Sequence, residues 1–477
     1  MRAVRKLLIK IFAPESLISD EIKLGDIPGM KTAYGVTANL ALPAVVEMVF
    51  IALIGVVNTA MVSNLGAYAI AAVGLIGQPR MLILSVFSAV SIGVTAIVAR
   101  SKGAENREDA NICLIQALFF SVLLSVVVAF AAYLMAEPLM YLVGAHEDTI
   151  VPSTGYFRIV CLALPFQALS LTISAAQRGI GQTKLTLKIN LTANIVNIIL
   201  NFLLIEGRFG FPRMEVAGSA VGVLVGQLCG LTLALHSILK KNEYLTLRNH
   251  RAEFWRPNPP MLKHIGQISS GAMLEQLAQR FGFIIFARLV ADLGTDVFAA
   301  HQIGMQMMNI TFTFGDGLSV ASTALVGQNI GKKRPDLSIM YGKTGQRFAF
   351  CVSCFMFSFI LILRHWFVRL FSDDPYILQL SANIIVIQAF FQFIQTSQVV
   401  MGGSLRGAGD TKFVAATMLI TVGVIRPGVS YLMIHPLNMG IFGAWIGIGL
   451  DMTVRLVLLM RRFSKGKWIQ EAMNRFI

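Results

Sequence analysis

Long apolar stretches recur along almost the whole chain, and short segments that carry most of the charged residues separate them. A helix of about 20 apolar residues is long enough to cross the hydrocarbon core of a bilayer. The stretches lie at 36–62, 70–99, 112–135, 152–176, 185–205, 216–239, 264–290, 298–326, 346–369, 376–402, 413–435 and 440–461. The pattern predicts an all-α polytopic membrane protein with twelve transmembrane helices.

The second half of the sequence repeats the first. Residues 40–184 align with residues 268–412 at a constant offset of 228, without a gap. The pattern RGxGxTK begins at Arg178 and again at Arg406. We expect each copy to form a turn whose basic residues anchor at the membrane interface. Because each half holds an even number of spans, the sequence predicts two parallel six-helix repeats, an arrangement found in many secondary transporters.

A proline-rich basic segment marks the boundary between the repeats. Residues 1–12 are expected to form an interfacial amphipathic helix, because Lys10 interrupts their apolar run. The predicted division is a cytoplasmic N-terminal segment 1–32, an N-lobe 33–240, an inter-lobe loop 241–263, a C-lobe 264–462 and a cytoplasmic tail 463–477.

The formal net charge of +15 is unevenly distributed. Most Lys and Arg residues lie before the first span, after the even-numbered spans and in the tail. The opposite side holds Arg208, Arg213, Arg288, Arg364 and Arg369. This asymmetry follows the positive-inside rule and predicts that both termini are cytoplasmic, in a plasma (inner) membrane. The charge is thus a topology signal and does not indicate nucleic-acid binding. A monomer in the lipid bilayer is expected.

Several short motifs then point to a family. They are Leu42-Pro43-Ala44, Val57-Asn58-Thr59-Ala60-Met61-Val62, Val326-Gly327-Gln328-Asn329-Ile330-Gly331 and the doubled RGxGxTK. Together with the repeat and the span count, they make the chain resemble the multidrug and toxic-compound extrusion (MATE) family over about residues 33–462. The resemblance implies an antiporter that expels organic cations and other small amphipathic compounds in exchange for protons or sodium ions.

Acidic residues inside the spans are the first candidates for ion coupling, since a carboxylate within a bilayer is costly unless it is paired, protonated or in a cavity. Glu47 and Glu275 are repeat equivalents. Asp316 lies in the eighth span and is either a second coupling acid or the partner of a membrane arginine such as Arg280. The resemblance implies a coupling acid on the seventh helix, where Glu275 lies. Asp451 is expected to pair with Arg455, four residues further along the same helix.

The chain departs from the family at Asn58, where many members have an aspartate that is their proposed proton site. An asparagine cannot exchange a proton near neutral pH, although its oxygen can contact a cation or a substrate. We therefore expect coupling through Glu275, with Glu47 secondary, and favour sodium held by Glu275 and Gln279 over a proton. A buried glutamate can also carry a proton, so both ions stay open.

Polar side chains recur on single faces of other predicted helices and indicate an internal cavity, because lipid exposure of amides is unfavourable. Interhelical hydrogen bonding is the alternative. The residues predicted to line the substrate cavity are Asn58, Asn194, Gln279, His301, Asn309 and Gln392.

The leading hypothesis is a cation-coupled antiporter that works by alternating access and uses no cofactor. The sequence lacks the phosphate-binding loop of an ATP-driven pump. A flippase for a lipid-linked precursor is the alternative, although the five arginines deep within the spans (Arg80, Arg158, Arg280, Arg426 and Arg455) are few for a strongly basic lumen. A membrane-embedded enzyme is less favoured, because no HExxH or GxSxG motif is present.

Overall fold

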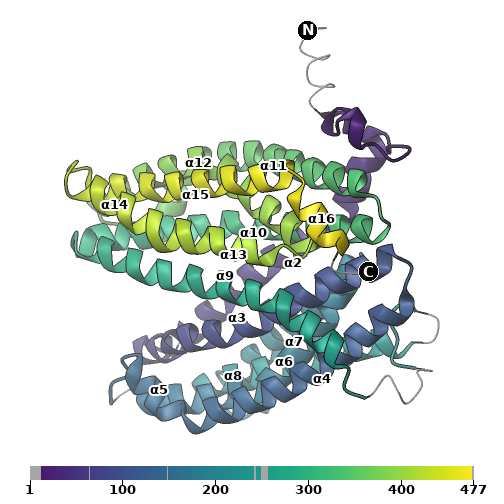
Figure 1. The fold of residues 1–477 in the computed structure, drawn as a ribbon. Helices are drawn as coiled ribbons and strands as arrows, with labels where there is room; N and C mark the ends of the chain where they lie inside the picture. The colour runs from purple at the N-terminus through teal and green to yellow at the C-terminus, as the bar shows by residue number, and fades with distance from the viewer. Residues whose placement is uncertain (1–11, 64, 148, 241–242, 249–255, 475–477) are drawn as a thin grey trace. The chain divides into compact units, whose positions relative to one another are not determined.

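The computed structural model describes residues 12–63, 65–147, 149–240, 243–248 and 256–474 (Figure 1). These residues form helices and connecting loops, with no strand among them. The helices of the first half are α2 (Met30–Ser63), α3 (Ala67–Gly103), α4 (Arg107–Leu134), α5 (Ala136–Leu142), α6 (Ile150–Gly179), α7 (Thr183–Leu204) and α8 (Glu215–Leu239). The amphipathic helix predicted for residues 1–12 lies outside the described residues, apart from its last residue.

The helices of the second half follow the same order. They are α9 (Pro259–Ala291), α10 (Thr295–Gly331), α11 (Pro335–Arg369), α12 (Pro375–Gly407), α13 (Thr411–Ile420), α14 (Arg426–Ile434), α15 (Gly440–Ser464) and α16 (Lys467–Asn474). A short π-helix, η5 (Thr421–Ile425), joins α13 to α14, so that the eleventh predicted span is one irregular helix. The predicted all-α fold with two six-helix halves is confirmed.

Ten of the described helical segments are long and apolar enough to cross a membrane by length and composition. They match ten of the twelve predicted spans. The other two, α9 and α10, lie where the seventh and eighth spans are predicted but are not among the ten. Both are longer than 30 residues, and they carry Glu275, Arg280, His301 and Asp316 along their length. Their polarity fits helices that face protein or water rather than lipid.

The chain divides into two compact units. Unit 1 contains residues 1–45, 103–105 and 270–477, and unit 2 contains residues 46–102 and 106–269. In unit 1, α12 packs against α10, α11 and α15; in unit 2, α6 packs against α4 and α8, and α8 packs against α7. The first turns of α2 thus belong to the unit that holds the second repeat.

Two elements outside the predicted spans are packed against unit 1. The N-terminal segment before α2 accepts a hydrogen bond from Lys343 Nζ at the Leu17 carbonyl, at 2.8 Å. The short helix α16 buries Trp468 completely, and its indole stacks on Phe463 with centroids 5.1 Å apart. The tail predicted for residues 463–477 therefore begins with a packed helix.

Candidate functional site

Glu47, on α2, is the centre of a closed polar cluster in unit 2. Its side chain is 1% exposed. Arg178 at the end of α6 donates to Oε1, and Asn190 Nδ2 donates to the same oxygen at 2.7 Å. Thr186 Oγ1 donates to Oε2 at 3.0 Å. Both carboxylate oxygens thus have donors, and the charge is neutralised by one arginine.

Glu275, on α9, makes the equivalent ion pair in unit 1. Arg406 Nη1 donates to Glu275 Oε1 at 2.6 Å, and Arg406 Nη2 donates to Ser319 Oγ of α10 at 3.0 Å. The two acids are separated by 228 residues, and so are the two arginines. Each RGxGxTK arginine therefore pairs with the acid of its own repeat. The expectation of interfacial anchors did not include these two ion pairs.

The glycines of RGxGxTK explain why each arginine reaches an acid. A Cβ atom at Gly179 would lie 2.9 Å from the Thr95 carbonyl oxygen, and one at Gly407 would lie 2.3 Å from that of Thr323, so each first glycine permits close helix packing. The second glycines, Gly181 and Gly409, have φ values of +89° and +81°. They reverse the chain directly after the helix, as left-handed residues do at many helix ends.

The two acid sites differ in what surrounds them. Glu275 is 6% exposed, and its Oε2 has no hydrogen-bond partner among the described residues. Asp316 lies one turn before Ser319 on α10, remains accessible, and is close enough for the charges of Arg406 and Glu275 to act on it. The repeat places Ser88 at the position equivalent to Asp316. With both acids ionised, Glu275, Asp316 and Arg406 have a formal charge sum of −1, whereas the Glu47–Arg178 pair sums to zero.

Asn58, on α2, belongs to a chain of amides in unit 2. Its Nδ2 donates to Asn197 Oδ1 at 2.9 Å, and its Oδ1 accepts from Asn201 Nδ2 at 3.0 Å. Gly222 on α8 makes room for this chain, because a Cβ atom there would lie 2.2 Å from Asn201 Oδ1. The three asparagines hold no charge, which agrees with the absence of an exchangeable proton at Asn58.

The other predicted cavity residues lie in different surroundings. His301 is buried between aromatic rings, with its centroid 5.5 Å from Phe286 and 5.7 Å from Trp445. Gln392 is fully buried and donates to Thr396 Oγ1 at 2.9 Å. Asn194 donates to the Asn190 carbonyl of its own helix at 2.8 Å. The Gln392 and Asn194 contacts thus lie within their own helices, and the aromatic rings around His301 favour a packing role for it.

Two predicted residues stay accessible. Asn309 is exposed on α10, and Gln279 is half-buried on α9, one turn beyond Glu275. Within the described residues Glu275 is paired with Arg406, and no hydrogen bond joins it to Gln279. Glu275 and Gln279, the two predicted sodium ligands, therefore lie one turn apart on α9 without a hydrogen bond between them. Arg406 donates to one of the carboxylate oxygens of Glu275.

A second buried ionic cluster was only half predicted. Asp451 Oδ1 accepts from Arg455 Nη2 at 2.6 Å, as the spacing indicates, but Oδ2 accepts from Arg426 Nη2, also at 2.6 Å. All three side chains are at most 4% exposed. Arg455 also donates to Thr421 Oγ1 at 3.0 Å, which ties the π-helix to α15. The cluster connects three elements and is best explained as a structural device.

Comparison with known proteins gives the same division into halves. The sequence pattern of the MatE family matches residues 43–203 and 272–432, once in each repeat. The chain belongs to the MatE family. The predicted resemblance is confirmed, and the alternative of a membrane-embedded enzyme is set aside. This MatE chain is an integral, multi-pass membrane protein.

Two relatives of similar length and one solved structure support the same family and fold. A probable multidrug resistance protein NorM of Thermotoga maritima is 28% identical over 436 residues, which cover 91% of this chain and 92% of the relative. The multidrug resistance protein MdtK of Pectobacterium atrosepticum is 25% identical over 431 residues and covers 89% and 93%. A transporter of the MOP superfamily from Pyrococcus furiosus has the same fold, with a TM-score of 0.85, 19% identity and coverage of 92% and 96%.

Proposed function

We propose that this MatE protein exports small amphipathic or cationic organic molecules in exchange for a cation, by alternating access. The names of its relatives, multidrug resistance proteins NorM and MdtK, support export of drugs. We assign binding of the exchanged cation to unit 1. The observation that carries this assignment is the net negative cluster of Glu275, Asp316 and Arg406.

The charge of this cluster suggests how one cation is bound. One monovalent cation neutralises a site of charge −1, and Glu275 Oε2 is a buried acceptor without a donor among the described residues. An incoming cation would compete with Arg406 for Glu275, since both need the same carboxylate. Moving one charge down the membrane potential supplies roughly 2.3 kcal/mol per 100 mV. The Glu47 site lacks these properties, because its oxygens are occupied.

Sodium is the favoured coupling ion. A hard cation takes several oxygen ligands, and Glu275, Asp316 and Gln279 would supply three of them from α9 and α10. The neutral amide chain at Asn58 has no acid to carry a proton. The alternative is proton coupling through Glu275. The direct test therefore has to distinguish sodium from protons as the coupling ion.

The direct test is drug efflux in vesicles with imposed gradients. We expect the purified protein in proteoliposomes to export a fluorescent drug when a sodium gradient is applied at fixed pH. A pH gradient without sodium should give little export. Vesicles without protein are the control. Full export driven by pH alone would refute the sodium preference, and no export under either gradient would refute the antiporter.

Orientation is the second part of the proposal. The distribution of basic residues supports cytoplasmic termini and a cytoplasmic loop at residues 241–263. A cysteine introduced at Asn258, in a variant that lacks the five native cysteines, should resist an impermeant thiol reagent in intact cells. It should react once the membrane is permeabilised. Ready labelling in intact cells would reverse the orientation.

A further inference from the structure

The buried ionic cluster of unit 1 has one more positive than negative side chain. Arg426 begins α14 directly after the π-helix, and Asp451 and Arg455 lie on α15, which packs against α14 (Figure 1). All three side chains are at most 4% exposed, and neither arginine forms an ion pair with a second acid among the described residues. A guanidinium is not deprotonated in proteins. Two arginines and one aspartate therefore leave a formal charge sum of +1 in the interior.

The hydrogen bonds of the cluster show which arginine lacks an acceptor. Every guanidinium nitrogen of Arg455 has one: Nε donates to Thr421 Oγ1, Nη1 to Gln398 Oε1 and Nη2 to Asp451 Oδ1. Arg426 directs both Nε and Nη2 to the other oxygen of Asp451, at 2.9 and 2.6 Å. The Nη1 atom of Arg426 is buried and has no partner among the described residues. The excess charge and the missing acceptor thus occur together at Arg426.

Aromatic side chains surround Arg426 and add further nitrogens without partners. The Arg426 guanidinium carbon lies 4.8 Å from the ring centroid of Phe283, which packs in the same apolar core as Trp445. Trp445 is buried, and its Nε1 has no acceptor among the described residues. The buried His301 ring is 5.7 Å from the Trp445 ring, its Nδ1 also lacks a partner in the described part of the chain, and the charge of Arg426 acts on it. Donors around a positive charge are the reverse of a cation site.

We infer that a small inorganic anion, chloride in the cell, binds at Nη1 of Arg426. Leaving a buried charge without a counter-charge is strongly unfavourable. A water molecule would satisfy the N–H group but not the charge, whereas an anion satisfies both. The ion has to be small because the site is buried between helices, and Nε1 of Trp445 and Nδ1 of His301 are its nearest additional donors. The anion is a structural ligand of unit 1, and its binding does not depend on the export function.

Two arginines provide a matched pair of variants. Arg426→Met removes the proposed anion ligand and leaves Asp451 and Arg455 as an ion pair whose formal charge sum is zero, so no charge stays uncompensated. We therefore expect this variant to fold. Arg288→Met is the control, because Arg288 also pairs with an aspartate, Asp292, but its side chain is 81% exposed. Both variants lose one arginine, and only the first loses the site.

The experiment measures the melting temperature of the purified full-length protein while sodium chloride replaces sodium gluconate at constant ionic strength. Sodium stays constant, so a sodium site cannot contribute, and gluconate is too large for a buried site. A ligand that binds only the folded protein raises its melting temperature. We expect chloride to raise that of the wild type and of Arg288→Met by about 2 °C or more, and bromide to act in the same way. The melting temperature of Arg426→Met should not depend on chloride.

A wild-type melting temperature that is independent of chloride would overturn the inference, as would an equal chloride effect in Arg426→Met. Stabilisation by acetate but not by chloride would also overturn it, because the occupant would then be a carboxylate.

A direct measurement applies even if Arg426→Met does not accumulate. The wild type should bind radioactive chloride at one saturable site from which bromide displaces it, and crystals grown in bromide should give an anomalous peak beside Nη1 of Arg426. No saturable binding, or bromide found only elsewhere, would refute the site. These measurements follow binding and not transport, so a failure of drug export in proteoliposomes would leave the anion site standing.

Discussion

Glutamine in place of Glu275 is expected to abolish gradient-driven drug export and leave the protein folded. The proposed mechanism needs a carboxylate that is paired with Arg406 in one state and neutralised by the coupling cation in another. Glutamine keeps the size and one oxygen but removes the negative charge, so that the remaining acid, Asp316, and Arg406 have a formal charge sum of zero. With no net charge to neutralise, the site loses its drive to take up a cation. Export in proteoliposomes under a sodium gradient should fall to the protein-free background.

The repeat offers a matched control in Glu47→Gln. Both substitutions remove one acid and leave one RGxGxTK arginine without its carboxylate, and the two arginines are similarly covered, at 13% and 16% exposed. We expect Glu47→Gln to lower the melting temperature but to keep coupled export. Equal loss of export in both variants would show that the paired acids share one role. Wild-type export by Glu275→Gln would instead move the coupling role to Asp316, to be tested with Asp316→Asn.

Much of the fold follows from local sequence. Apolar runs of membrane length and a repeat with a constant offset are read directly along the chain, and they predict the twelve helical segments and their division into halves. The Asp451–Arg455 pair was predictable for the same reason, because residues four apart on a helix are neighbours. The π-helix at Thr421–Ile425 was not, since its apolar sequence looks like that of any other span.

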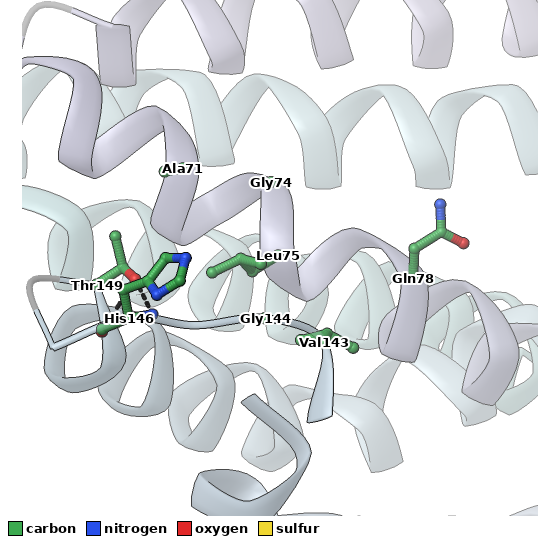
Figure 2. A pocket seen from close by; sticks show the side chains of 8 residues that line it. All are labelled: Ala71, Gly74, Leu75, Gln78, Val143, Gly144, His146 and Thr149. Carbon is green, nitrogen blue, oxygen red and sulfur yellow. Dashed lines mark hydrogen bonds between the residues drawn. The ribbon is translucent and has the colours of Figure 1, made fainter. Parts of the chain in front are cut away.

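The site depends on contacts that the sequence does not specify. Glu275 and Arg406 are 131 residues apart, and helical periodicity says which face a residue occupies but not which helix covers that face. The equal 131-residue separation of Glu47 and Arg178 was a usable signal, because a repeated acid and a repeated arginine inside an apolar lobe both need partners. A pocket that His146 lines (Figure 2) depends on the backbone of the turn between α5 and α6, and no sequence motif predicts it.

Asparagine in place of Asp451 is expected to give the largest loss of stability. Asp451 is fully buried and is the ion-pair partner of both Arg426 and Arg455, which are also buried. Asparagine has nearly the same shape but no charge, so two arginines would remain in the interior without a counter-charge. Removing one partner of a buried ion pair typically costs about 3–5 kcal/mol. The melting temperature of the purified protein, followed by intrinsic tryptophan fluorescence, measures the loss.

The exposed pair Arg288–Asp292 provides the control, because it has the same spacing of four residues but its side chains are 81% and 54% exposed. Asp292→Asn should change the free energy of unfolding by less than about 0.5 kcal/mol. If Asp451→Asn fails to accumulate in the membrane, the triple variant Arg426→Met, Asp451→Leu, Arg455→Met should restore folding. Apolar side chains of similar size often replace a buried ionic cluster without loss of stability. Equal melting temperatures for Asp451→Asn and Asp292→Asn would contradict the structural role of the cluster. Failure of the triple variant would show that these charges are needed for more than mutual neutralisation.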